Sequence, residues 1–475
     1  MFITSNVITG SGVQFGTSGS RGLVEDFTPE VCTAFTYAFI GSIRDKFNFD
    51  SVAIAIDNRP SSPKIAKAII NAVKEMGLNP IYYGVVPTPA LAYVAMQDAI
   101  PCIMVTGSHI PFDRNGLKFY RPDGEITKDD EIAILNAGVE FTLSSDGSAL
   151  DISTRAAEVY IERYTSLFNS QFLKGRRVGI YEHSSAGRDL YAKIFESLGA
   201  EVISLERSDQ FIPIDTEAVS ESDKLKAFNW SKEHDLDFIF STDGDGDRPL
   251  VSDEKGNWLR GDILGLLCAK ELGIEALALP VSCNTAVELS EAFTHTTRTK
   301  IGSPYVIAEF DDLAKTYKSV AGFEANGGFL LGTDTVFDGV TIKALPTRDA
   351  VLPALMLLSA SRSTPISQMV EQLPKRYTHS DRIQNFATEK SVAILEVAKA
   401  KSELFLASLG FENVQVESTD LTDGLRITLV NGDIIHFRPS GNAPELRCYA
   451  ESDSEQQAHF LVTQALTKIQ TTAFA

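Results

Sequence analysis

The chain has 475 residues, of which 44% are apolar and 22% charged, and its formal net charge at pH 7 is −20. This acidic balance argues against nucleic acid or an anionic membrane as the partner, and the length predicts about three to four domains of roughly 100–200 residues each. The five scattered cysteines indicate neither a disulfide framework nor a zinc site, and without a secretory signal or a long apolar segment we expect a cytoplasmic protein.

Strand and helix patterns alternate through most of the chain and predict α/β layers with mixed or parallel sheets. Residues 51–56 form an apolar run typical of a buried strand, and helical spacing follows from Ser62 to Gly77. A second strand–helix–strand unit begins near Arg177, and a third begins near Asp262. We therefore predict three α/β domains, over residues 1–150, 151–253 and 254–372.

The C-terminal part of the chain follows a different pattern. A long helical pattern covers roughly residues 389–409 and precedes two strand-like segments, 425–430 and 434–437. Asn431-Gly432 joins these segments, and Asn-Gly between two strands is a strong hairpin signal. We expect residues 373–475 to form an antiparallel α+β domain.

Three aspartates, Asp243, Asp245 and Asp247, alternate with glycines directly after an apolar, strand-like run. Alternation places their side chains on one side, and the glycines let the backbone wrap tightly. The carboxylates can then converge on a small divalent cation, for which Mg²⁺ is the best match. A plain glycine–aspartate turn is one alternative. An EF-hand loop would place Glu254 at its twelfth position, but its sixth position needs glycine and holds Arg248.

Three further segments carry groups suited to phosphate chemistry. Ser108 follows the apolar strand-like run 102–105 and is a candidate nucleophile, although a lone serine in such a place is more often a cap or turn residue. Lys118 could act as a general acid or base, although most lysines are only solvated. The glycine-rich segment 15–22 with Arg21 is typical of an anion-binding loop, which alone is weak support.

A fourth segment, residues 438–447, is a turn with an arginine at each end. Backbone N–H groups, the side chains of Ser440 and Asn442, and the guanidinium groups of Arg438 and Arg447 suit a phosphate dianion. A protein this acidic must gather positive charge locally to bind phosphates. The segment therefore predicts a phosphate-binding loop.

Taken in order from residue 15 to 447, these segments resemble the α-D-phosphohexomutase family. The resemblance implies four domains around a central cleft, the first three α/β and the last α+β. It also implies that Ser108 is a phosphorylated serine. The implied Mg²⁺ ligands are the phosphorylated Ser108 together with Asp243, Asp245 and Asp247.

The resemblance also implies roles for other residues of these segments. Arg21 and Arg248 would steady the transferring phosphoryl group, and Lys118 and His109 would be the acid/base candidates. Asp57 and Arg59 match a supporting motif of the first domain. The implied sugar-binding residues are Glu324, Asn326, Gly302 and Ser303. The implied ligands of the phosphate that does not react are Arg438, Ser440, Gly441, Asn442 and Arg447.

The reaction implied by the resemblance passes through the phosphoserine. It gives its phosphoryl group to a hexose phosphate, a 1,6-bisphosphate forms, and the other phosphate returns to Ser108. The expected cofactors are Mg²⁺ and hexose 1,6-bisphosphate, and the expected partner is a phosphosugar bound by a monomer or homodimer. The loop Glu324-Ala325-Asn326-Gly327 is most similar to the phosphomannomutases of the family, which implies interconversion of mannose 6-phosphate and mannose 1-phosphate.

Several alternatives stay open at this point. Phosphoglucomutase or dual specificity is close, because gluco and manno sugars differ only at C2 and one hydrogen bond could decide between them. Phosphoglucosamine mutase is a weaker alternative. A phosphosugar phosphatase or bisphosphate synthase could use the same groups, whereas a non-catalytic sugar-binding protein would be expected to have lost Ser108 or one of the aspartates.

The sequence departs from the commoner family patterns at a few positions. Gly107 and Ile110 stand where Ala and Asn are frequent, which leaves the serine itself intact. Asn326 replaces a frequent Ser, Gly328 stands where His is common, and Ser303 stands where Asp or His is often found. The changes in the sugar-binding loops bear on the identity of the substrate rather than on the type of reaction.

Overall fold

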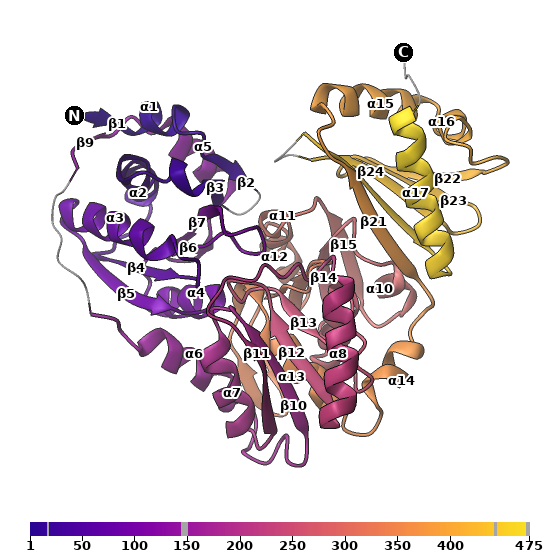
Figure 1. Cartoon of the computed structure of the whole chain (residues 1–475), viewed down its shortest axis with the longest axis horizontal. Coiled ribbons are helices and arrows are strands. Elements are labelled where there is room, and N and C mark those ends of the chain that lie inside the picture. Colours follow the sequence, from indigo (N-terminus) through magenta and orange to yellow (C-terminus); the bar gives the residue numbers. More distant parts are fainter. Residues whose placement is uncertain (17–18, 144–150, 441–443, 472–475) are drawn as a thin grey trace.

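A computed structural model describes residues 1–16, 19–143, 151–440 and 444–471. Figure 1 shows four principal sheets that follow one another along the chain, each with helices packed against it. This confirms the expected multidomain α/β fold with mixed sheets. Within the described ranges, no helix has both the length and the apolar character that crossing a membrane would require.

The first sheet has the order β2-β3-β7-β6-β4-β5, with β8 paired to β7, while β1 and β9 pair separately. β4 runs parallel to β5 and β6, and β3 and β7 add antiparallel strands beside them. The strand expected at 51–56 and the helix expected from Ser62 are both present. The strands of this part of the chain are β1 (Phe2–Ile3), β2 (Gln14–Gly16), β3 (Gly19–Leu23), β4 (Ser51–Ile56), β5 (Asn79–Val85), β6 (Cys102–Val105), β7 (Arg114–Arg121), β8 (Gly124–Glu125) and β9 (Glu140–Phe141). The helices are α1 (Thr4–Thr9), the short η1 (Val24–Asp26), α2 (Pro29–Ile43), α3 (Ser62–Glu75), α4 (Thr88–Gln97) and α5 (Lys128–Asn136).

The second sheet has the order β11-β10-β12-β13, in which β10 is parallel to both of its neighbours and β13 is antiparallel. β12 is fully buried and ends where the three aspartates begin. Its strands are β10 (Arg177–His183), β11 (Glu201–Arg207), β12 (Phe238–Thr242) and β13 (Pro249–Val251), and its helices are α6 (Arg155–Thr165), α7 (Arg188–Ser197) and α8 (Glu221–His234).

The third sheet has the order β15-β14-β16-β17-β20, with β18 and β19 as a separate hairpin. The strands here are β14 (Ala276–Pro280), β15 (His295–Thr299), β16 (Val320–Phe323), β17 (Phe329–Leu331), β18 (Thr335–Phe337), β19 (Val340–Ile342) and β20 (Leu345–Asp349). The helices are α9 (Gly261–Glu271), α10 (Ala286–Leu289), α11 (Ser303–Ile307), α12 (Phe310–Ala314), α13 (Val351–Ala360) and α14 (Ile366–Glu371).

The fourth sheet is antiparallel throughout, in the order β21-β25-β24-β23-β22. The predicted hairpin is present at Asn431-Gly432, where Gly432 has a φ of 85°. The strands are β21 (Tyr377–Ile383), β22 (Val416–Asp420), β23 (Leu425–Leu429), β24 (Ile434–Pro439) and β25 (Leu446–Ser452).

The helices beside this sheet correct one expectation. The single helix predicted over 389–409 is divided into α15 (Thr388–Ala400) and α16 (Ser402–Ser408), and α17 (Glu455–Thr471) ends the described chain. At Lys401 the backbone leaves the helical region, with φ −147° and ψ 62°. The Ser402 hydroxyl donates to the Ala398 carbonyl at 2.9 Å. This side-chain bond competes with the helical hydrogen-bond pattern.

The apolar cores show which sheets are joined. One buried cluster runs continuously from β4 and β6 through α7 to α9 and α13, so the first three sheets share a core. Asp349, at the end of β20, adds a polar tie because it accepts hydrogen bonds from Tyr160 (2.8 Å) and Tyr164 on α6. The fourth sheet has a separate core of its own, between residues 383 and 469.

Candidate active site

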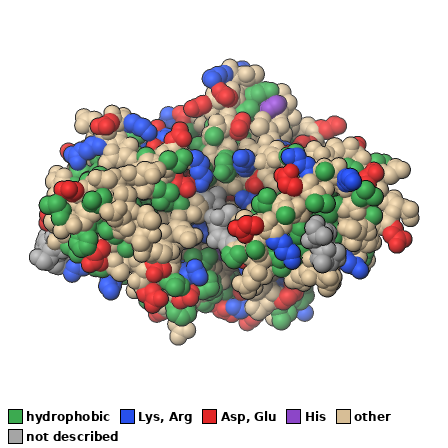
Figure 2. Space-filling model, turned by 90° about the horizontal axis from the view of Figure 1, so that it is seen from above, with side chains coloured by type: hydrophobic (Ala, Val, Ile, Leu, Met, Phe, Trp, Pro, Cys, Tyr) green, Lys and Arg blue, Asp and Glu red, His purple; other side chains and the backbone are tan. Residues whose placement is uncertain are grey.

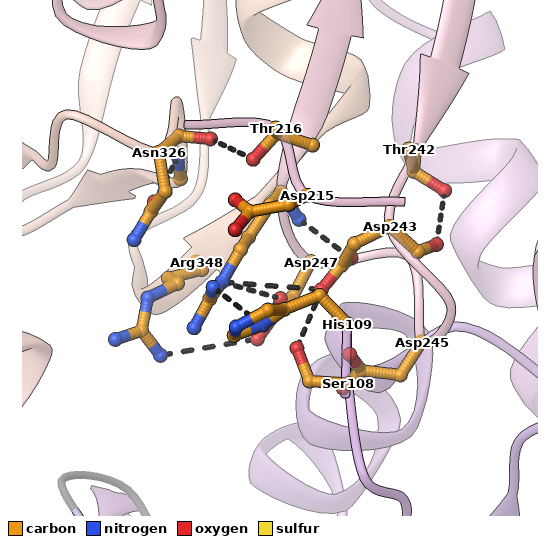
Figure 3. A network of polar contacts seen from close by, with 12 residues as sticks. Ser108, His109, Asp215, Thr216, Thr242, Asp243, Asp245, Asp247, Asn326 and Arg348 are labelled. Atoms are coloured by element: carbon orange, nitrogen blue, oxygen red, sulfur yellow. Dashed lines mark hydrogen bonds and ion pairs between the residues drawn. The ribbon is translucent and has the colours of Figure 1, made fainter. Parts of the chain in front are cut away.

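Ser108 lies on the loop that leaves the carboxyl end of β6. Its backbone has a φ of 55°, a left-handed conformation that is strained for a residue other than glycine. The Thr106 hydroxyl accepts a hydrogen bond from the Ser108 N–H at 2.8 Å. The Ser108 hydroxyl is buried and donates to Oδ2 of Asp243 at 2.6 Å. The structure therefore brings the predicted nucleophile into contact with the aspartate loop of the second sheet (Figure 3).

Arg59 supports the loop that carries Ser108. Its Nε donates to Asp57 at 3.0 Å, and its other nitrogens lie 2.6–2.9 Å from four backbone carbonyl oxygens. These belong to Ser108, Ile110, Pro111 and Arg114. A Cβ atom at Gly107 would lie 2.6 Å from the guanidinium carbon of Arg59. Glycine instead of the more frequent alanine therefore suits the space beside this buried arginine.

The three aspartates lie between β12 and β13, so strands flank the loop. An EF-hand requires helices there, and this alternative is thereby excluded. One carboxylate oxygen from each aspartate lies within 4.8 Å of the others, and all three side chains are buried. Oδ1 of Asp245 and Oδ1 of Asp247 have no hydrogen-bond partner among the described residues. Buried oxygens of this kind need a partner, and as hard anionic ligands they fit a divalent cation such as Mg²⁺.

Lys118 projects from β7 into this cluster of carboxylates. Its Nζ lies 2.6 Å from Oδ2 of Asp245 and 2.5 Å from Oδ2 of Asp247. Burial disfavours the charged lysine, but the two carboxylates outweigh it and the pKa of Lys118 is raised. Burial and the neighbouring carboxylates likewise raise the pKa of Asp243 well above its usual range. The triad therefore depends on positive charge from other parts of the chain.

His109, Arg248 and Arg21 lie beside the triad. Arg248 donates from Nη1 to Nδ1 of His109 at 3.0 Å, which leaves the ring proton on Nε2. Burial and the positive charges of Arg248 and Arg21 lower the pKa of His109 to about 2, so the ring is neutral. Burial and the nearby Arg248 also lower the pKa of Arg21, on β3, to about 10.

The loop after β16 carries Glu324 and Asn326, both buried. Oδ1 of Asn326 accepts from the N–H of Gly328 at 3.0 Å, and its carbonyl accepts from the Thr216 hydroxyl at 2.7 Å. The Glu324 carboxylate accepts a short hydrogen bond from Nε of Arg348. The loop is thus held by Arg348 on the third sheet and by Thr216, which lies between β11 and α8.

Arg348, on β20, is a site residue that sequence reasoning missed. Its side chain is only 3% exposed, and its Nη1 lies 3.8 Å from Oδ2 of Asp247. It therefore joins the Glu324 loop to the aspartate triad (Figure 3). Burial disfavours its charge, but Glu324 and Asp247 outweigh burial and raise its pKa. A Cβ atom at Gly328 would lie 2.6 Å from Cδ of Arg348, so this arginine fills space where histidine is common in the family.

Gly302 and Ser303 lie at the start of α11. The φ of Gly302 is 135°, a conformation that favours glycine. Ser303 is buried, and its hydroxyl donates to Oε2 of Glu125 on β8 at 2.7 Å. Glu125 is a second residue that sequence reasoning missed, because it lies on the first sheet while its partner belongs to the third.

The predicted phosphate-binding loop joins β24 to β25. Arg438 lies directly opposite Arg447 in the strand register, so both arginines stand at the same end of the sheet. The Ser440 N–H donates to the carbonyl of Glu445 at 2.9 Å, and this backbone bond closes the base of the loop. Three residues of the predicted loop lie outside the described part of the chain, namely Gly441, Asn442 and Ala443.

The phosphate-binding loop and the Ser303 segment are also linked to each other. Oδ2 of Asp423 accepts from Nε of Arg438 at 2.8 Å and from the N–H of Ile301 at 2.9 Å. Ile301 directly precedes Gly302, so one carboxylate of the fourth domain contacts both segments. Figure 2 views the molecule from above and shows a hollow near the middle of that face, with Lys, Arg, Asp and Glu side chains around it.

Comparison with known proteins identifies the family. Models of the phosphoglucomutase/phosphomannomutase family match three parts of the chain: α/β/α domain I at residues 12–140, α/β/α domain II at 158–256, and the C-terminal domain at 384–467. A phosphomannomutase of Salmonella muenchen is 58% identical over 469 residues, which cover 99% of this chain and 98% of that protein. A phosphomannomutase of Sinorhizobium fredii is 42% identical over 96% of this chain and 98% of that protein.

Solved structures share the fold. A phosphoglucomutase/phosphomannomutase family protein from Burkholderia thailandensis superposes with a TM-score of 0.75 at 20% identity, covering 100% of this chain and 99% of that chain. N-acetylphosphoglucosamine mutase of Aspergillus fumigatus, in complex with GlcNAc-6P and magnesium, superposes with a TM-score of 0.58 at 12% identity over 98% of both chains. The length and identity of the sequence matches, together with the shared fold, place this chain in the phosphoglucomutase/phosphomannomutase family of phosphosugar mutases.

Proposed function

We propose that the protein is a phosphomannomutase that interconverts mannose 6-phosphate and mannose 1-phosphate through phosphorylated Ser108. The observation that carries the proposal is the 2.6 Å contact between the Ser108 hydroxyl and Asp243, which joins a nucleophile to a buried acidic triad. The choice of mannose is supported by the relative at 58% identity, which is itself a phosphomannomutase. We further propose that the protein acts in the cytoplasm, as a monomer or homodimer.

Charge compensation is the main task of the site in this proposal. Asp243, Asp245 and Asp247 would hold Mg²⁺, which when bound neutralises charge on a transferring phosphoryl group. Arg21 and Arg248 lie beside the triad and would pair with the oxygens of that group. Such fixed charges stabilise the transition state because they need no rearrangement when the reaction occurs.

Proton transfer is assigned to Lys118. This side chain reaches the triad from β7 and carries a proton. His109 is neutral and already accepts a hydrogen bond at Nδ1 from Arg248, so it is a weak base in this arrangement. We assign His109 the role of orienting Arg248, and its Nε2–H would donate to a phosphate oxygen.

Sugar and phosphate recognition would come from the other two domains. Glu324, whose carboxylate is oriented by Arg348, would accept hydrogen bonds from sugar hydroxyls. Hexose 1,6-bisphosphate would be the intermediate, and it must turn over within the site without being lost or hydrolysed. The phosphate that does not react would be bound by the loop between β24 and β25, through Arg438, Ser440, Gly441, Asn442 and Arg447.

The substrate can be tested directly. We expect the protein, with Mg²⁺ and a trace of hexose 1,6-bisphosphate, to turn over mannose 1-phosphate faster than glucose 1-phosphate, measured as the 6-phosphate formed. Equal rates would support a dual-specificity mutase, which the family name itself allows. Release of free phosphate from both sugars would contradict the mutase and support a phosphatase, and accumulation of bisphosphate would support a bisphosphate synthase.

Ser108→Ala removes the proposed phosphoryl acceptor. We expect it to abolish turnover and to prevent labelling of the protein by hexose 1,6-bisphosphate, measured by mass spectrometry of the intact chain. The circular dichroism spectrum should match that of the wild type, because the variant loses only the hydrogen bond from this hydroxyl to Asp243. A Ser108→Ala protein that keeps its activity would exclude Ser108 as the nucleophile.

Asp245→Asn tests the metal site. Replacing one carboxylate of the triad should lower the rate about 100-fold or more and raise the Mg²⁺ concentration needed for half-maximal rate. The matched control is Asp209→Asn, whose exposed carboxylate pairs with Arg188 at 3.1 Å. An Asp245→Asn titration curve that overlays the wild-type curve would remove this residue from the metal site.

Arg348→Gln tests the residue that links Glu324 to the triad. The change leaves Glu324 buried without its cation, and losing one partner of a buried charge pair costs roughly 2–5 kcal/mol. We expect kcat/KM to fall by about two orders of magnitude, because Glu324 would no longer be held in position for the sugar hydroxyls. Arg177→Gln, which breaks an exposed pair with Glu201 at 3.5 Å, is the control. Similar kinetics in the two variants would show that Arg348 has no role in the reaction.

A further inference from the structure

We propose that Glu125 is a positioning residue for sugar selection, although it lies outside the sugar-binding domain. Its carboxylate, on β8 of the first sheet, holds the segment that carries Ser303 in the third. This inference rests on the proposed function and deepens it. It assigns to the first domain a part in choosing the sugar, in addition to carrying Ser108.

The geometry of Glu125 joins it to two separate parts of the third domain. Oε2 accepts from the Ser303 hydroxyl and Oε1 accepts from the Thr347 hydroxyl, both at 2.7 Å. The side chain is buried, with only 8% of the residue exposed. Each oxygen therefore has a defined partner, and the carboxylate links the two hydroxyls to each other.

Each of the two partners lies next to a group of the proposed site. Ser303 follows Gly302 at the start of α11, in the segment expected to contact the sugar. Thr347 precedes Arg348, whose guanidinium binds the Glu324 carboxylate. A displacement of Glu125 would therefore affect both the Ser303 segment and Arg348, the partner of Glu324.

The Ser303 segment has two polar anchors, because the Ser303 hydroxyl bonds to Glu125 and the N–H of Ile301 bonds to Asp423 at 2.9 Å. A cavity lies beside Glu125 and is lined in part by Tyr120 and by Pro304, the neighbour of Ser303. Of these two bonds, the one to Glu125 joins the Ser303 segment to the first domain.

A buried carboxylate would not be needed if the contact between the two domains served only stability. Burying it costs free energy that must be recovered from its hydrogen bonds, whereas apolar groups would join two domains without that cost. What hydroxyl–carboxylate bonds add is a defined direction. Glu125 therefore serves to orient the Ser303 segment.

A double-mutant cycle between Glu125 and Ser303 tests the inference. Glu125→Gln keeps the size of the side chain, and Ser303→Ala removes its partner. We expect Glu125→Gln to raise KM for mannose 1-phosphate about fivefold with little change in kcat, and to change the ratio of kcat/KM between mannose and glucose 1-phosphates. In the Ser303→Ala background the same change should alter KM less than about twofold, because the contact is already lost.

The matched control is Glu131→Gln. Glu131 lines the same cavity, but its carboxylate pairs with Lys128 at 2.6 Å, within its own helix. This variant should keep the wild-type KM and the wild-type ratio between the two sugars. Glu125→Asp, which keeps the charge on a shorter side chain, serves as a second variant if Glu125→Gln lowers the melting temperature strongly.

Two outcomes would overturn the inference. One is an equal loss of kcat for both sugars with KM unchanged, as expected for a brace that only stabilises the fold. The other is a set of independent effects, in which Glu125→Gln and Ser303→Ala multiply in the double mutant. Failure of the proposed function is distinct, because the wild type would then not convert mannose 1-phosphate into the 6-phosphate. In that case the same double-mutant cycle is evaluated from the dissociation constants of mannose 1-phosphate, measured by calorimetry. Coupling between Glu125 and Ser303 would again support the inference, and independent effects would overturn it.

Discussion

The burial of three adjacent carboxylates is the constraint on which the rest of this structure depends. Asp243, Asp245 and Asp247 lie too close together to remain ionised in a protein interior without compensation. The compensating groups come from different sheets. Lys118 reaches the triad from β7, Arg248 from the aspartate loop itself, and Arg348 from β20. The relative placement of the first three domains therefore determines whether these cations reach the triad.

The shared apolar core explains how groups from different sheets keep fixed positions relative to one another. The buried cluster that joins the first three sheets is continuous, so a strand of one sheet is packed against helices of the next. Polar ties reinforce this packing where the chain crosses from one domain to another. Asp349 accepts from Tyr160 and Tyr164, and Glu125 accepts from Ser303 and Thr347. These ties specify orientation as well as proximity.

The sequence was most informative where chemistry depends on neighbouring residues. The aspartate triad, the strand before it and the Asn431-Gly432 hairpin all follow local rules, and the structure contains each of them. The division of the helix at Lys401 was not predicted, because a hydrogen bond from the Ser402 hydroxyl to the preceding helix leaves no pattern in apolar spacing.

Residues whose role depends on long-range pairing could not be predicted. Arg348 is one of two adjacent charged residues in a short strand, and only the structure shows that it fills the space beside Gly328. Glu125 and Ser303 are separated by the whole second domain in sequence, so no local spacing connects them. The domain boundaries and the roles of individual site residues stay predictions.

Because the fourth sheet has a separate core, its domain can fold after the first three domains during synthesis. Domains generally fold as units, and the N-terminal ones fold first during synthesis. The common core of the first three sheets ends before β21, so it can condense while the last domain is still being translated. Arg438 and Arg447 are therefore synthesised after the part of the chain that buries the triad. A nascent chain would assemble the aspartate triad early and complete the phosphate-binding loop only when translation is almost finished.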